Sequence, residues 1–235
     1  MDTDNATQSE AIRSTTRLLW IVVAVMAVFS VVAPFVKGRF TPAEAAIIHS
    51  PDTLLYVLDI NERSDSSILR TPSADIPVRL LRSEDYALLC SKMLSTVKHP
   101  SQDGVGIAAP QIGIDRRVAV VQRFDKQGEP FEVYANVRID SLWGEVTHGP
   151  EGCLSVPPMR GLVPRFSSVK VSYTDISTLK RVSEEVSGYT AIIFQHECDH
   201  LDGRLYTDRA DTVFTSMEWA AERAHFDSLG FYRRK

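Results

Sequence analysis

Apolar residues recur at steps of three and four over residues 84–97, which predicts an amphipathic helix. Ser83 can cap the start of this helix, and Glu84 and Asp85 favour its first turn because they complement the helix dipole. We expect Cys90 to be a core residue, since free cysteine packs as a small hydrophobe. The apolar face consists of Tyr86, Leu89, Cys90, Met93, Leu94 and Val97.

Short segments rich in Val, Phe and Tyr predict strands, and Gly128 lies at a hairpin turn between the first two of them. A buried helix is expected over Tyr189–Leu201, ending at Gly203. Strands with helices before and after them in the chain predict an α+β fold. The predicted strands are residues 118–121, 131–137, 169–173 and, more weakly, 182–186.

Two segments that precede residue 84 have weaker hydrophobic patterns. Thr41 and Pro42 suit the beginning of a short helix that ends near His49. Residues 61–75 are rich in Ser, Asp and Arg without a sustained apolar period, so we expect a loop there.

The longest apolar run is Leu18–Val36, with 19 residues and no charge, which is enough for a membrane-spanning helix. Its length favours an uncleaved membrane anchor. The two alternatives are a cleaved signal peptide, whose apolar core is usually shorter, and a buried helix. Arg13 and Arg17 precede it, and Lys37 and Arg39 follow it, so the flanking charges favour neither orientation. We therefore expect membrane association, with the following domain either cytoplasmic or exported.

Composition and net charge limit which classes of protein this chain can belong to. The chain has 235 residues, of which 44% are hydrophobic, so it can bury one sizeable core. Its net charge is -4 without a basic stripe, and we expect no direct contact with nucleic acid. Three cysteines, Cys90, Cys153 and Cys198, do not form the even set that is typical of a disulfide scaffold.

The segment QHECDHLDG, residues 195–203, carries the strongest chemical pattern. His196 and His200 lie four residues apart, on one helical face, and Glu197 lies beside them. Two imidazoles and a carboxylate in this arrangement are typical of hydrolases in which a metal activates water. The alternative is that both histidines merely flank a buried helix.

A catalytic site of this kind needs a third protein ligand. Cys153, in EGCLS, is one candidate, although free cysteine is also commonly an inert core residue. Glu218 or Glu222 is the other, and either would indicate a zinc endopeptidase.

The segment GVGIAAPQIG, residues 104–113, precedes EGCLS and QHECDHLDG in the chain. These three motifs together resemble the signatures of the peptide deformylase family, in the same order along the chain. The resemblance extends over about residues 55–207. It implies an α+β fold with antiparallel sheets packed around a central metal-binding HExxH helix. It also implies an enzyme that removes the formyl group from N-formylmethionyl peptides or proteins and releases formate. The motifs are GVGIAAPQIG (104–113), EGCLS (151–155) and QHECDHLDG (195–203), with further similarity in SILRTPS (67–73) and VPPMRGLVPR (156–165).

The resemblance implies that Cys153, His196 and His200 hold one divalent ion. Fe²⁺ is the usual ion of the family, whereas this ligand set also suits Zn²⁺, Ni²⁺ or Co²⁺. Glu197 would take a proton from water and pass it to the leaving amine.

Further roles carry over from the family by position. The side-chain amide of Gln111 and the backbone N–H of Leu154 would donate to the oxyanion. Asp199 would orient a ligating histidine or pair with Arg165, while Cys198 and Pro158 have no expected catalytic role. Residues expected to contact the substrate are Val105, Gly106, Ile107, Gly149, Arg160, Tyr189, Ile192 and Ile193.

The expected partners are N-formyl peptide or protein N-termini and the membrane, and we expect a monomer. A membrane-anchored module that binds formyl peptides without catalysis is a third hypothesis, although Glu197 and Gln111 are both present. The predicted divisions are a polar tail (1–17), a membrane segment (18–36), a linker with a short helix (37–54), a catalytic domain (55–207) and a helical extension (208–235).

Overall fold

The computed structural model describes residues 39–102 and 104–228. The chain divides into two units, Met1–Thr41 and Pro42–Lys235, and the second contains the fold considered below. The predicted membrane segment, residues 18–36, lies outside the described residues. Within the described part of the chain, no helix is long and apolar enough to cross a membrane.

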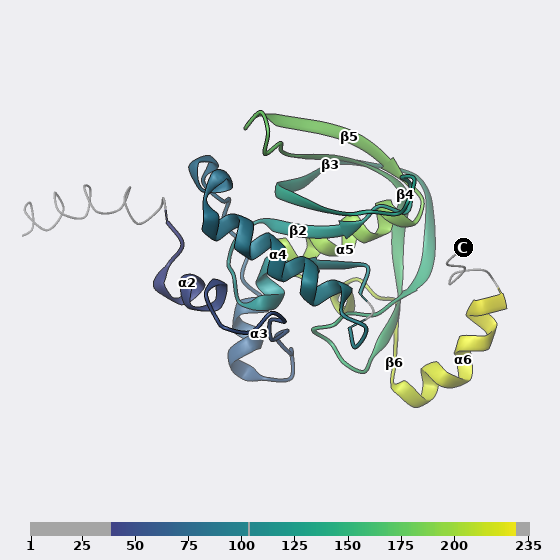
Figure 1. Ribbon diagram of the computed structural model, residues 1–235. Coiled ribbons are helices and arrows are strands. Elements are labelled where there is room, and N and C mark those ends of the chain that lie inside the picture. Colours follow the sequence, from purple (N-terminus) through teal and green to yellow (C-terminus); the bar gives the residue numbers. More distant parts are fainter. Residues whose placement is uncertain (1–38, 103, 229–235) are drawn as a thin grey trace, which may run out of the picture. The chain divides into compact units, whose positions relative to one another are not determined.

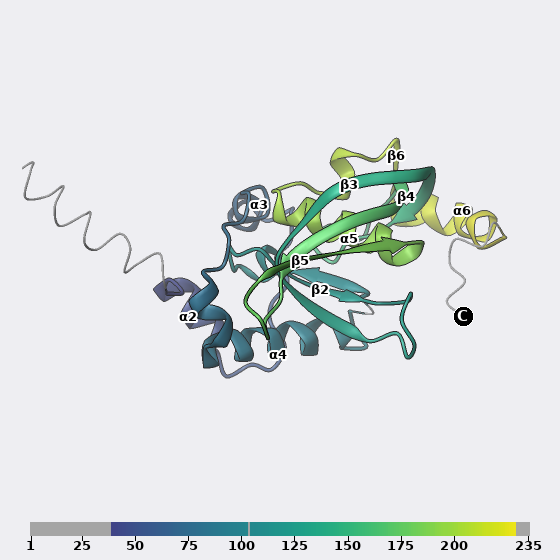
Figure 2. The ribbon, with the colours of Figure 1, turned by 90° about the horizontal axis from the view of Figure 1, so that it is seen from above.

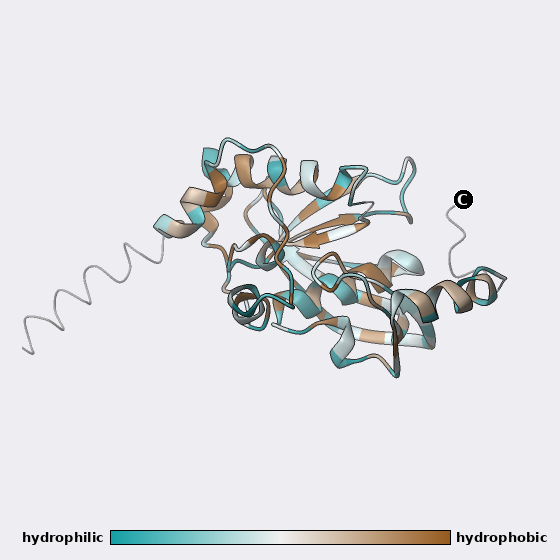
Figure 3. Cartoon of the chain, turned by 90° about the horizontal axis from the view of Figure 1, so that it is seen from below, coloured by the Kyte–Doolittle hydropathy of each residue, from teal (hydrophilic) through white to brown (hydrophobic). Residues whose placement is uncertain are grey.

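The helix predicted after Ser83 is present, and the Oγ atom of Ser83 accepts a hydrogen bond from the Tyr86 N–H at 3.2 Å. This helix, α4, alternates between hydrophobic and hydrophilic positions in Figure 3, as its sequence period requires. The short helix predicted after Thr41 is also present. The helices are α2 (Pro42–Ile48), α3 (Arg63–Leu69), α4 (Glu84–Lys98), α5 (Tyr189–Leu201) and α6 (Ser216–Ser228), with 3-10 turns η1 (Val78–Arg82), η2 (Ala109–Ile112) and η3 (Tyr206–Asp208).

The prediction of a loop over residues 61–75 is wrong in part, because α3 lies within it. Leu69 is fully buried, whereas the other side chains of this helix are polar or only partly covered. One buried position in a seven-residue helix cannot produce a visible apolar period. Asp65 lies in the first turn of α3, where a negative charge is favourable.

The described strands form one antiparallel sheet in the order β1-β2-β3-β4-β5, with β6 paired to β4 (Figure 1). Strand β3 is much longer than its predicted segment, and register shifts interrupt its pairing with β4. Such bulges bend a strand and increase its twist. The strands are β1 (Gly106–Ala108), β2 (Val118–Gln122), β3 (Phe131–Glu151), β4 (Arg160–Thr174), β5 (Arg181–Ser187) and β6 (Thr212–Phe214).

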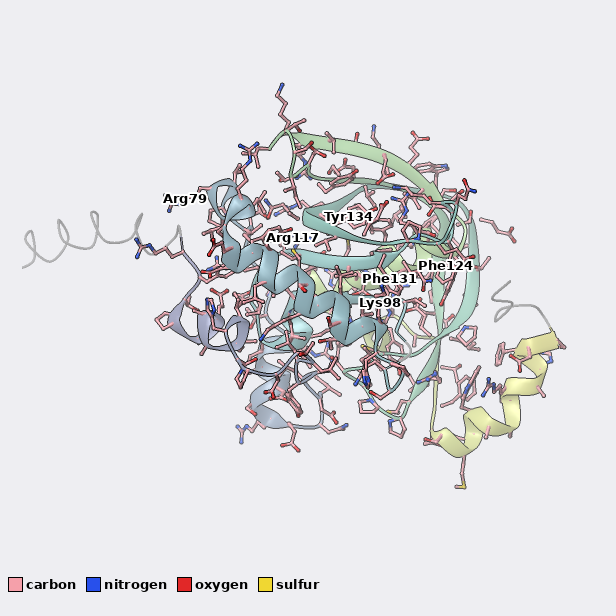
Figure 4. The ribbon with its side chains drawn as sticks, viewed as in Figure 1. Arg79, Lys98, Arg117, Phe124, Phe131 and Tyr134 are labelled. Atoms are coloured by element: carbon pink, nitrogen blue, oxygen red, sulfur yellow. The ribbon has the colours of Figure 1, made fainter. Side chains whose placement is uncertain are left out.

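Helix α5 lies between β2 and the long β3–β4 pair, and α4 lies on the other side of β2 (Figure 2). Ala191 and Phe194 of α5 are fully buried in a cluster with Ala119 and Val121 of β2. At the end of α4, the ammonium group of Lys98 lies 5.7 Å from the ring centroid of Phe131, and both are labelled in Figure 4. Helix α5, which carries the histidines, contacts strands β1 to β5.

Candidate metal centre and active site

Cys153, His196 and His200 converge inside the bend of the sheet. One turn of α5 separates the two histidines, and Cys153 follows the end of β3. Their ligand atoms all lie within 4.8 Å of one another, and the Cys153 Sγ atom is 3.2 Å from the His200 Nε2 atom. In the described part of the chain, this is the one group of His, Cys and acidic side chains with such convergence.

Glu151 fixes the orientation of His196. The His196 Nδ1 atom lies 2.8 Å from the Glu151 Oε2 atom, which leaves Nε2 available for a ligand. Arg165 donates to both oxygens of the same carboxylate, from Nε to Oε1 at 2.8 Å and from Nη2 to Oε2 at 3.0 Å. Burial acts to raise the pKa of Glu151, but the hydrogen bonds from His196 and Arg165 lower it to about 2. Glu151 is therefore an anion that favours a proton on His196 Nδ1.

Glu197 lies beside the ligand group and is 3% exposed. Its Oε2 atom has no hydrogen-bond partner among the described residues. Burial raises the pKa of Glu197 to about 7. Gly106 of β1 adjoins this carboxylate so closely that a Cβ atom on Gly106 would lie 2.3 Å from Glu197 Oε1.

The Gln111 side-chain amide lies beside the ligand group. Ala108 N–H donates to the Gln111 Oε1 atom at 2.8 Å, which turns the Gln111 amide nitrogen toward Cys153 Sγ, at 3.5 Å. The same nitrogen lies 3.3 Å from the Ser155 Oγ atom. No described residue accepts a hydrogen bond from Leu154 N–H, and Leu154 lines the adjoining pocket.

The pocket has a volume of about 240 Å³ and reaches the ligand group. Ile107, which we expected in the cleft, is fully buried and does not line it. His200 and Asp199 also lie behind the pocket wall. The predicted residues that do line it are Val105, Gly106, Gln111, Gly149, Cys153, Leu154, Arg160, Arg165, Tyr189, Ile192, Ile193, His196 and Glu197.

Asp199 contacts arginines and not a histidine. The Arg165 Nη1 atom donates to its carboxylate at 2.6 Å, as the predicted pair requires, and Arg209 donates two further hydrogen bonds at 2.7 Å. The carboxylate that reaches a histidine is Glu151, which sequence reasoning missed. Its position inside EGCLS, two residues before Cys153, was an available signal.

The two alternative third ligands for the metal, Glu218 and Glu222, lie outside the site. Glu218 and Glu222 lie on α6, and both are exposed. Glu218 accepts a hydrogen bond from the Thr215 N–H at 2.7 Å, near the start of its own helix. Neither belongs to the converging group, so the structure does not favour the endopeptidase hypothesis.

A buried carboxylate beside a Cys/His/His group is typical of one class of protein, the hydrolases in which a metal activates water. Residues 57–215 match the family described as Polypeptide deformylase. The chain belongs to this family and is an enzyme of the peptide deformylase type.

Relatives and solved structures agree with this family. Peptide deformylase 2 of Bordetella bronchiseptica is 38% identical over 156 residues, which cover 64% of this chain and 85% of the relative. A peptide deformylase of Leptospira biflexa is 38% identical over 149 residues, covering 60% and 82%. The actinonin-bound class I type b peptide deformylase from Acinetobacter baumannii is 35% identical, with a TM-score of 0.59, covering 68% of this chain and all of that one. The peptide deformylase from Thermotoga maritima is 30% identical, with a TM-score of 0.58, covering 68% and 99%.

Proposed function

We propose that this enzyme hydrolyses the formyl amide of N-formylmethionyl peptides or proteins and releases formate, using one divalent ion. The convergence of Cys153, His196 and His200 beside the buried Glu197 carries this proposal. The family supports the choice of a formyl amide as the bond that is broken. The helix that carries the two histidines would then be the metal-binding helix that the sequence predicts.

The residues fit a metal ion. One thiolate and two imidazoles are a suitable donor set for Fe²⁺, Zn²⁺, Ni²⁺ or Co²⁺, and we propose Fe²⁺ from the family. His196 has the hydrogen-bonded Nδ1 atom that ligating histidines usually have. A bound ion would supply Lewis acidity, which lowers the pKa of water to about 7.

Side chains of the protein would carry the proton and stabilise the developing charge. Glu197, unpartnered at Oε2, would take the proton of the attacking water and give it to the departing amine. The Gln111 amide and the Leu154 N–H would donate to the oxygen of the formyl group as it becomes negative. Donors of this kind stabilise the transition state most when they are held in position before the charge develops.

The substrate would bind in extended form along β1. This strand pairs only with β2 among the described strands, so a peptide backbone could pair with its other edge beside the Ala108 N–H, which already donates to Gln111. Val105, Ile192 and Ile193 give the pocket an apolar lining that suits a methionine side chain.

Formate release from formyl-Met-Ala-Ser tests the proposed function. The full chain, purified in detergent and loaded anaerobically with Fe²⁺, is expected to produce one formate for each free amine. A longer peptide without a formyl group serves as the control substrate, because only an endopeptidase would cleave its internal peptide bonds. Absence of formate at confirmed metal occupancy would overturn the proposal, and cleavage of the control peptide would instead support an endopeptidase.

Gly106→Ala is expected to lower kcat/KM by on the order of a hundredfold, because the new methyl group displaces the Glu197 carboxylate. Gly128→Ala is a suitable control, because its positive φ of +79 makes the substitution strained while the space around it is open, so it tests loss of stability without a clash at Glu197. If the effect acts through Glu197, Gly106→Ala should add little to Glu197→Gln. Full additivity of the two losses would contradict this explanation.

Membrane association remains a prediction from the sequence of residues 18–36. We propose that this segment anchors the enzyme, on either side of the membrane, and that residues 55–207 contain the catalytic machinery. Strand β6 pairs with β4 beyond this limit, so the sheet itself continues to Phe214. Resistance of the full chain to alkaline carbonate extraction would support the anchor, and its release into the supernatant would contradict it.

A further inference from the structure

The end of β2 and the residues just after it contact residues on two walls of the pocket. Gln122 N–H donates to the Val105 carbonyl oxygen at 2.8 Å, and Val105 lines the pocket beside β1. Two residues later, the ring of Phe124 lies 5.2 Å from the ring of Tyr189, measured between centroids. Tyr189 lines the pocket from the start of α5. A short stretch of backbone thus joins the two walls from behind.

Arg123, between these two contacts, is buried and 2% exposed. It forms paired hydrogen bonds with Asp125, at 2.8 and 2.7 Å, and with Glu184 of β5, at 2.9 and 3.1 Å. It also donates to the Tyr134 hydroxyl at 2.5 Å. Asp125 in turn donates its backbone N–H to the Thr190 Oγ atom of α5, at 3.3 Å. Arg123 therefore connects two strands, the hairpin and the start of α5.

A buried guanidinium group tolerates few arrangements. Its desolvation is offset only while several acceptors remain in good geometry. Paired hydrogen bonds to two carboxylates fix the plane of the group as well as its position. Phe124 lies between Arg123 and Asp125 in the chain, so these ion pairs hold its backbone on both sides. Figure 4 labels Phe124, just after β2, and Tyr134 on β3.

We propose that Arg123 is a positioning residue that sets the pocket for the first side chain of the substrate, by holding Phe124 against Tyr189. This role rests on the proposed function for its biological meaning. It does not require catalysis to be measured, because the affinity for a deformylated peptide would depend on the same pocket.

Arg123→Lys tests the role, since lysine keeps the charge but loses the paired geometry. The measurement is calorimetric affinity of the metal-loaded full chain for Met-Ala-Ser and for Ala-Ala-Ser. We expect the preference for methionine over alanine to fall by on the order of tenfold, with metal content unchanged. Among active preparations, KM for formyl-Met-Ala-Ser should rise while kcat changes less than about twofold.

Phe124→Leu removes the ring contact without touching the ion pairs, so it tests the role even if Arg123→Lys fails to fold. It should lower the same preference, and the double variant should lose little more than either single variant. Arg116→Lys is the matched control, because Arg116 forms a similar pair at 2.8 and 3.0 Å, but its partner is Glu44 of α2, outside the segment that carries Phe124.

Three results would overturn the inference. They are an unchanged preference in both folded variants, the same loss in Arg116→Lys, and a wild-type enzyme that does not distinguish the two peptides. A wild-type enzyme that distinguishes the peptides but releases no formate would contradict the proposed function alone.

Discussion

Cys153→Ala is expected to leave the protein without a stoichiometric divalent ion and to lower formate release at least on the order of a hundredfold. The substitution removes one of the three converging ligands and leaves only His196 and His200. Two imidazoles alone do not provide the three protein ligands of a catalytic site. Metal content after gel filtration, measured by mass spectrometry, and formate release together check this result.

Cys198→Ala is the matched control for this substitution. Cys198 is also buried, at 4% exposure, but it packs in the apolar cluster around α5. We expect some loss of stability with full metal content, because only packing is removed. Stoichiometric metal in Cys153→Ala would contradict the ligand assignment and would revive Glu218 or Glu222 as the third ligand.

Glu197→Gln is expected to lower kcat by on the order of 10²–10⁴-fold, the usual contribution of general acid–base catalysis. The amide has nearly the same shape as the carboxylate but cannot take a proton. Glu197 is not one of the converging ligands, so metal content and KM should change little. Single-turnover formate release on the metal-loaded variant separates the chemical step from binding.

Glu222→Gln is a suitable comparison, because Glu222 is an exposed acid on α6. Its kinetics should match those of the wild-type enzyme. If Glu197→Gln retained activity within about tenfold of wild type, another group would have to carry the proton.

Local patterns predicted the elements whose burial is periodic. The period of α4 and the apolar content of α5 are properties of single segments, and both helices are present. Strand β3 was underestimated because Leu142, Trp143 and Val146 are apolar yet 42%, 39% and 42% exposed, so its outer half lacks an inside-outside alternation. Helix α3 was missed because only Leu69 of this helix is buried, so its sequence has no repeated apolar pattern.

The residues of the site could be predicted from the sequence only through its motifs. The i, i+4 histidines follow from helical geometry, whereas the approach of Cys153 depends on how the sheet bends. Glu151 and Arg123 were missed for a related reason. Their partners are distant in sequence, His196 for one and Glu184 for the other, and no local period encodes such pairs.

Strand β1 has only three residues, which limits what can join its outer edge. Unpaired strand edges attract other chains and promote aggregation, and very short edge strands are one natural protection. A partner along β1 can form few main-chain hydrogen bonds, and these carry no information about side chains. Under the proposed function, the enzyme should therefore accept many different peptide sequences after the first residue, while two copies of the protein gain little from pairing edge to edge.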